Sequence, residues 1–192
     1  KSLALVAAIL LLPIFLSAQL ENRYWYWGLG AGLDFATDPP TVLEDNVGVI
    51  APTKGLSVSD PDGNLLFYNT HTDLRDANHN RIPGSLNLRL GGSFGRDLYS
   101  IPNPGDSTEH YIFSFEQQPS GFYTLSYSSI LTSPTLRLGA RKIAITDSVF
   151  GKITLVKHAN NHDFWLLTQS ANYDIHAFLI DSFGISSNTP II

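Results

Sequence analysis

One pentapeptide of the sequence has the spacing of the nucleophile turn of serine hydrolases, with Gly91, Ser93 and Gly95 at alternate positions. In that motif a strand precedes the serine and a helix follows it, so that the hydroxyl stands on a sharp turn. Residues 86–90 suit a strand, but the chain after Gly95 reaches Pro102 without a helical period. The pattern therefore favours a glycine-rich loop between strands over a catalytic serine.

Three short groups combine residue types that ligate metals, and each group lies in a predicted turn. They are His158 with His162, Asp60 with Asp62 and Asn64, and Asp76 with Asn78 and Asn80. Histidines four residues apart form a zinc site on a helix, but Asn160 and Asn161 between them predict a turn. The two acidic groups alternate like the start of a calcium loop and lack its closing glutamate. Hairpin turns account for all three groups, so the sequence predicts no metal and no cofactor.

An aromatic cluster is the best candidate for a contact surface. It consists of Tyr24, Trp25, Tyr26 and Trp27. Aromatic faces stack on sugar rings and are common at protein interfaces. If the cluster is a strand, alternation buries half of it and leaves the other half for a glycan, a protein partner or a neighbouring sheet. Gly28, Gly30 and Gly32 follow as a tight turn, and no βαβ unit surrounds them as a dinucleotide site would require.

Aspartates carry the alternative, enzymatic hypothesis. A propeller glycosidase or lyase acting on extracellular polysaccharide needs a pair of carboxylates that face the central axis. The available residues are Asp34, Asp60, Asp97 and Asp163. Spacing alone does not show that any two of them converge, so the sequence predicts a non-catalytic protein, with the enzyme as the alternative.

Composition and the N-terminal segment bound the functional class. The 192 residues contain 17 acidic and 12 basic side chains, and this acidic balance argues against nucleic-acid binding. A positive Lys1, an apolar run over residues 3–15 and small residues at 17–18 predict a secretory signal peptide over residues 1–18. The chain has no cysteine, so a disulfide framework is excluded. We expect the folded domain to occupy residues 19–192.

Strand–turn–strand units recur along this domain. They cover residues 55–68, 97–115 and 152–167. The second strands are separated by 45 residues from Phe67 to Ile112 and by 53 residues from Ile112 to Trp165. Short strands repeating every ~40–50 residues are typical of β-propeller blades. We therefore predict an all-β fold, a partial propeller of about three antiparallel blades that ends before the ring of about four to eight blades closes.

Several longer stretches resemble one family of bacterial proteins. They are residues 25–35, 57–69, 78–83, 101–105 and 155–165. These motifs are similar to the N-terminal region of large secreted Bacteroidetes proteins that carry a C-terminal gliding-motility-associated sorting domain. The resemblance implies a propeller-like β domain, export by the type IX secretion machinery through a sorting domain outside this chain, and a place on the cell surface or outside it. It brings no catalytic residues.

The predicted function is a non-catalytic interaction or adhesion module of a secreted or cell-surface protein. Its partner is expected to be a protein or a glycan at the cell surface, contacted by the cluster of Tyr24, Trp25, Tyr26 and Trp27. A polysaccharide-acting propeller enzyme and a glycan-binding module are the alternatives. Converging carboxylates would favour the enzyme, and a row of exposed aromatic side chains would favour glycan binding.

Overall fold

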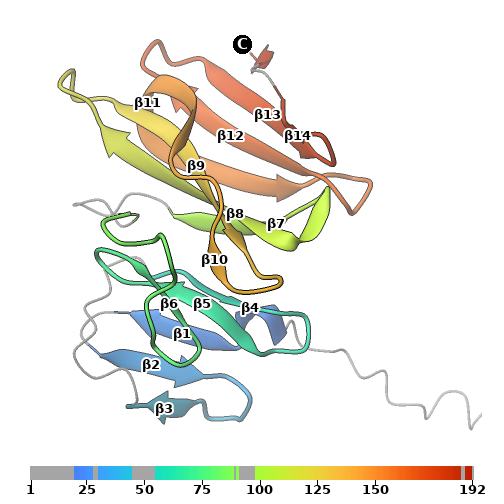
Figure 1. The fold of residues 1–192 in the computed structure, drawn as a ribbon. Coiled ribbons are helices and arrows are strands. Elements are labelled where there is room, and N and C mark those ends of the chain that lie inside the picture. The colour runs from blue at the N-terminus through green and yellow to red at the C-terminus, as the bar shows by residue number, and fades with distance from the viewer. Residues whose placement is uncertain are drawn as a thin grey trace, which may run out of the picture.

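The predicted all-β class is confirmed by the computed structural model, in which every strand pairing is antiparallel (Figure 1). The structure describes residues 20–27, 30–44, 55–88, 90, 98–186 and 189–191. Within this part of the chain the one helical element is a 3-10 turn, η1 (Leu20–Asn22). No helix of the described part is long and apolar enough to cross a membrane.

Two small sheets precede a large one. The first sheet has the order β1-β2-β3 and the second the order β4-β5-β6. Their strands are β1 (Tyr24–Trp27), β2 (Ala31–Asp34), β3 (Thr41–Leu43), β4 (Ser57–Ser59), β5 (Leu65–Asn69) and β6 (Leu74–Asp76). Strand β3 has only three residues, too few for its two-residue period to be recognised in the sequence.

The third sheet is nine-stranded, with the order β14-β13-β12-β11-β9-β8-β7, β10 on β9 and β15 on β13. Its strands are β7 (Tyr99–Asn103), β8 (Asp106–Gln117), β9 (Tyr123–Leu131), β10 (Arg137–Leu138), β11 (Ile143–Lys157), β12 (Phe164–Ser170), β13 (Ile175–Asp181), β14 (Gly184–Ile185) and β15 (Thr189–Ile191). The two later hairpins, which the sequence analysis assigned to separate blades, thus belong to one open sheet.

Strand β11 joins the two halves of this sheet. Its residues 143–149 pair with β9, and its residues 153–157 pair with β12. The register of β11 shifts between Val149 and Ile153. In this part of the strand Ser148 and Gly151 have positive φ angles of 57° and 74°. Such bulges bend a strand, and the bend turns one half of the sheet toward the other. The far edges meet, because a Cβ on Gly105 of the β7–β8 turn would lie 2.4 Å from the carbonyl oxygen of Ser182 beyond β13.

The concave face of the bent sheet encloses the larger hydrophobic core, here called the sheet core. Its buried members come from β7, β8, β9, β11, β12 and β13, and they are Ile101, Tyr111, Phe113, Phe115, Tyr123, Leu125, Val149, Ile153, Leu166, Phe178 and Ile180. The odd-numbered residues of β8 point into this core, as the two-residue period of a strand requires. Ile112 therefore points the opposite way.

Ile112 belongs to a second core, the intersheet core, which lies between the β4–β6 sheet and the outer face of β8 and β9. Its buried members are Phe67, Leu74, Ile82, Leu88, Leu90, Ile112 and Ile130. Both faces of β8 are thus covered, which explains its continuous buried run from Tyr111 to Phe115. Leu74 and Ile82 are buried although they lie among polar residues, because the sheet of β8 and β9 covers them.

The first sheet is attached to the second by Tyr26 of β1. Its ring stacks on Tyr68 of β5 with the centroids 4.5 Å apart, and its backbone N–H donates to Oγ of Ser57 at 3.0 Å. Gly32 on the neighbouring strand leaves room for the ring, since a Cβ there would lie 2.8 Å from Tyr26 Cε1. Consecutive sheets therefore pack on one another in chain order (Figure 1).

His110 lies beside the intersheet core, and we expect it to make the free energy of unfolding depend on pH. The ring of His110 meets Phe67 edge-on at 5.8 Å, and its buried Nδ1 has no hydrogen-bond partner among the described residues. Burial disfavours the charged imidazolium and lowers the pKa of His110 below its ordinary value. Because the unfolded chain then binds the proton more readily than the folded one, stability is lost as pH falls through the unfolded pKa of about 6.5.

We expect the urea midpoint of the protein to drop between about pH 7 and pH 5, and the variant His110→Phe to flatten that drop. Replacing the exposed His71 by asparagine is the matched control and should leave the pH dependence unchanged. Equal slopes for the protein and for His110→Phe would show that His110 does not carry the effect.

Candidate functional site

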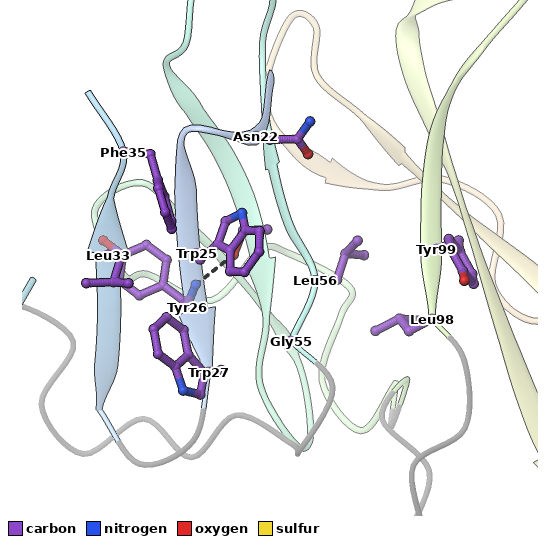
Figure 2. Close-up of a pocket in the computed structure, with 11 residues that line it drawn as sticks. Asn22, Trp25, Tyr26, Trp27, Leu33, Phe35, Gly55, Leu56, Leu98 and Tyr99 are labelled. Atoms are coloured by element: carbon purple, nitrogen blue, oxygen red, sulfur yellow. Dashed lines mark hydrogen bonds between the residues drawn. The ribbon is translucent and has the colours of Figure 1, made fainter. Parts of the chain in front are cut away.

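The described part of the chain contains a cleft of about 730 Å³ between the first sheet and the edges of the other two (Figure 2). Its lining is mostly apolar and consists of Asn22, Trp25, Tyr26, Trp27, Leu33, Phe35, Gly55, Leu56, Ser57, Leu98 and Tyr99. Three of the four residues in the predicted aromatic cluster line it, and Tyr24 does not. We call this site the aromatic cleft.

Strand alternation decides which aromatic side chains of β1 are accessible. Trp25 and Trp27 are 54% and 39% exposed, whereas Tyr26 between them is 3% exposed. The two indoles therefore remain available to a partner, while the tyrosine anchors the strand. Phe35, just beyond β2, is 43% exposed and contacts Trp25 with ring centroids 5.1 Å apart. These three rings form one wall of the cleft.

An ion pair braces this wall. Arg23 donates from Nε and Nη2 to the two carboxylate oxygens of Asp34, both at 2.7 Å, and its guanidinium lies 4.8 Å from the ring centroid of Tyr24. The hydrogen bonds from Arg23 lower the pKa of Asp34 and raise the pKa of Arg23. This two-point contact ties the start of β1 to the end of β2, and so sets the positions of Trp25 and Phe35.

The opposite wall comes from β4 and β7. Gly55 and Leu56 lie before β4, and Leu98 and the 40% exposed Tyr99 lie at the start of β7. The backbone at Gly55 approaches β1 so closely that a Cβ would lie 2.2 Å from the carbonyl oxygen of Tyr26. Only glycine permits this contact, which sets how far β1 stands from β4. The sequence analysis missed Tyr99, since nothing local links it to the cluster at Tyr24–Trp27.

The described lining of the cleft is poor in titratable side chains. Among its described lining residues there is no carboxylate, imidazole or ammonium group. Asn22 supplies the one amide side chain, and the hydroxyl oxygen of Ser57 already accepts the N–H of Tyr26. What remains is an apolar surface with four exposed aromatic rings.

Three of the four aspartates proposed for catalysis are bonded within their own hairpins. Asp34 pairs with Arg23, Asp60 accepts from the backbone and side-chain nitrogens of Asn64, and Asp163 accepts from Asn160 and contacts His162. Hydrogen bonds from His162 and then Asn160 lower the pKa of Asp163. Burial disfavours ionisation of Asp60, yet the hydrogen bonds from Asn64, Asp62 and Gly63 together outweigh it and lower its pKa. Asp97 lies outside the described residues.

The metal-like groups form hairpin turns. His158 Nδ1 accepts the N–H of Asn160 at 3.2 Å, and the backbone of His158 pairs with that of Asp163. Asp76 accepts the backbone N–H groups of Asn78 and Asn80 through one carboxylate oxygen. In the described part of the chain no three histidine, aspartate or glutamate side chains gather in a way that would hold a metal ion.

Most residues of the two glycine motifs, at 28–32 and at 91–95, lie outside the residues that the structure describes. Ser93 and its two flanking glycines, Gly91 and Gly95, lie outside the described residues, as does Gly28. Gly30 has a positive φ of 67° in the β1–β2 turn, where the sequence predicted a tight glycine turn.

Comparison of the chain with protein-family models, with curated proteins and with solved structures finds no match.

Proposed function

We propose that this protein is a non-catalytic interaction module that binds a protein partner in the aromatic cleft. The observation that supports the proposal is the gathering of four exposed aromatic rings in one cleft. They are Trp25, Trp27, Phe35 and Tyr99. Tryptophan and tyrosine dominate the binding energy of protein interfaces, because they bury large rigid surfaces at a small entropic cost.

A protein segment suits the lining better than a glycan does. Sugar sites hold several carboxylate, amide or guanidinium side chains beside an aromatic ring, whereas the described lining of the cleft has one such group, the amide of Asn22. An extended segment would place apolar side chains between the indoles and Tyr99. Among the described residues strand β7 is an edge of its sheet, and such an edge beside Tyr99 suits pairing with an added strand.

The module is proposed to be a partial β-propeller of a secreted protein. The packing of the β4–β6 sheet on the nine-stranded sheet, through the intersheet core, supports the propeller, since neighbouring blades pack face to face. The predicted signal peptide and the resemblance to type IX-secreted surface proteins support a location at the cell surface. On this proposal the module presents the aromatic cleft to a partner outside the cell.

Replacing both cleft tryptophans by alanine is expected to weaken binding of a cleft-directed peptide by about 30-fold or more. The probe is a peptide selected from a random phage-displayed library on the full chain, and its affinity is measured by fluorescence titration. The peptide carries the fluorescent label, because the double variant lacks both tryptophans that line the cleft. The physical reason is the loss of two large apolar contact surfaces.

The matched control is Phe183→Ala, which removes an aromatic ring that is 97% exposed and lies outside the cleft. It should leave the peptide affinity unchanged. Peptides that bind the double variant Trp25→Ala/Trp27→Ala as tightly as the unaltered protein would contradict the proposal. If the cleft binds one class of sugar and no peptide, the protein is a glycan-binding module instead.

A further inference from the structure

A second aromatic group lies on the nine-stranded sheet, outside the aromatic cleft. The ring of Phe150 on β11 contacts Phe122 before β9 at 5.6 Å and Tyr173 of the β12–β13 turn at 5.4 Å between centroids. The β8–β9 and β12–β13 turns reach the same end of this sheet (Figure 1). A backbone hydrogen bond of 2.7 Å from Ala171 to the carbonyl oxygen of Ser148 joins the β12–β13 turn to the bulge of β11.

The backbone of Tyr173 is unusual for its residue type. Four hairpin turns share one pattern of backbone hydrogen bonds. The N–H of the first residue donates to the carbonyl of the fifth, and the N–H of the fourth donates to the carbonyl of the first. These turns begin at Asp60, Asp76, Gln118 and Ser170. Their fourth residues all have positive φ, and they are Gly63, His79, Gly121 and Tyr173. This conformation suits glycine and is uncommon for a bulky side chain.

Burial of the side chain does not explain why a tyrosine occupies this position with positive φ. His79 is the fourth residue of its own turn, and its Nδ1 shares a 2.9 Å hydrogen bond with the hydroxyl of Tyr68. The side chain of His79 thus has a partner inside the protein. Tyr173 is instead 73% exposed. A strained residue whose side chain faces solvent is better explained by a ligand than by the stability of the fold.

A polar group lies on the same face. Thr124 Oγ1 donates to Asp147 Oδ1 at 2.6 Å, and Gln118 Nε2 donates to both side chains, at 2.8 and 3.1 Å. Phe122 and Thr124 flank the buried Tyr123, so strand alternation places both of them on the outer face. The carboxylate of Asp147 is exposed and has a second oxygen available for a ligand hydroxyl.

We propose that this surface binds a neutral saccharide. We call it the Tyr173 face and define it by Phe122, Thr124, Asp147, Phe150 and Tyr173. Aromatic rings receive the apolar C–H face of a sugar, and a carboxylate with an adjacent amide receives its hydroxyl groups through charge-assisted hydrogen bonds.

The charge of the surface selects against acidic sugars. Asp147 and the exposed Asp174 next to Tyr173 repel a uronate or a sialylated chain. The Tyr173 face lies on β9, β11 and the β12–β13 turn, whereas the aromatic cleft lies on β1, β4 and β7. The two sites are therefore independent, and either one can fail without the other.

The test uses the full chain on an array of neutral and acidic oligosaccharides, followed by titration calorimetry with the neutral oligosaccharide that binds best. We expect neutral chains alone to bind, and Tyr173→Gly to weaken binding by about tenfold or more. The same variant should unfold at an equal or higher temperature, because glycine relieves the left-handed backbone conformation. Tyr173→Phe keeps the ring and should keep the affinity within about threefold.

Two controls separate this site from other surfaces. Phe183→Ala removes a fully exposed ring elsewhere, and Trp25→Ala/Trp27→Ala removes the aromatic cleft; both should bind the saccharide as the unaltered protein does. The proposal is overturned if no neutral oligosaccharide binds, if Tyr173→Gly binds it equally well, or if that variant is destabilised while Tyr173→Phe is not, which would assign the ring to the fold.

Discussion

Replacing Tyr26 by alanine is expected to lower the free energy of unfolding by about 3–5 kcal/mol, the range for large aromatic side chains in a core. Tyr26 is 3% exposed, stacks on Tyr68 and meets His79 edge-on. Gly32 faces the ring and has no side chain with which to fill the space left behind. The cavity would lie where the first sheet meets the second, so both the attachment of that sheet and the aromatic cleft should loosen.

The measurement is urea unfolding followed by circular dichroism and by tryptophan emission. The control is Trp25→Ala on the same strand, which removes a half-exposed ring and should cost about 1 kcal/mol or less. We expect the tryptophan emission of Tyr26→Ala to shift toward that of the unfolded chain before the sheet signal is lost. A loss of stability no greater than that of Trp25→Ala would show that the first sheet is held by other contacts.

Replacing Asp73 by alanine is expected to cost about 2–4 kcal/mol, toward the lower part of the range for a broken buried ion pair. Its carboxylate, 4% exposed, accepts from Thr70 Oγ1 at 2.6 Å and from Arg75 Nε at 3.1 Å, and lies 3.7 Å from Arg81 Nε. Both arginines are partly exposed, so water can solvate them once the carboxylate is gone. The buried hydroxyl of Thr70 would lose the closer of its two acceptors and keep the backbone carbonyl of residue 73, at 3.1 Å.

Chemical denaturation of Asp73→Ala and Asp73→Asn measures this effect. Asp73→Asn keeps a side-chain oxygen that accepts from Thr70, so it should lower the free energy of unfolding by less than Asp73→Ala does. Glu116→Ala is the matched control, because Glu116 pairs with Lys142 at the surface, where ion pairs contribute about 0–1 kcal/mol. If Asp73→Ala costs no more than Glu116→Ala, the carboxylate does not hold the turn before β6.

The hairpins were largely predictable because their signals are local. The Asp60–Asn64 turn was expected from proline, glycine and two residues that bond their own backbone, and Asp60 accepts from Asn64 as expected. The strand at Tyr123–Leu131 follows from its two-residue period. The first half of β11 was missed, because its bulges at Thr146–Val149 break that period.

The candidate site was only partly predictable. Tyr24–Trp27 was chosen for its aromatic composition, and alternation predicted that half of it would be buried without saying which half. The structure shows that Tyr26 is the buried residue. The other wall of the cleft comes from Gly55 and Tyr99, which lie far along the chain and on other sheets. The Tyr173 face was not foreseen either, since its three aromatic side chains come from separate segments that carry no common motif.

By itself, the sequence determined the all-β class, the hairpin turns and which side of each strand is apolar, because these depend on neighbouring residues and on the period of the strand. The tertiary structure alone decided which sheets share a core, where the bend in β11 folds the large sheet, and which exposed rings meet. Those outcomes depend on contacts between residues far apart in the chain, and no local pattern of residue types encodes which sheet a given apolar face will meet.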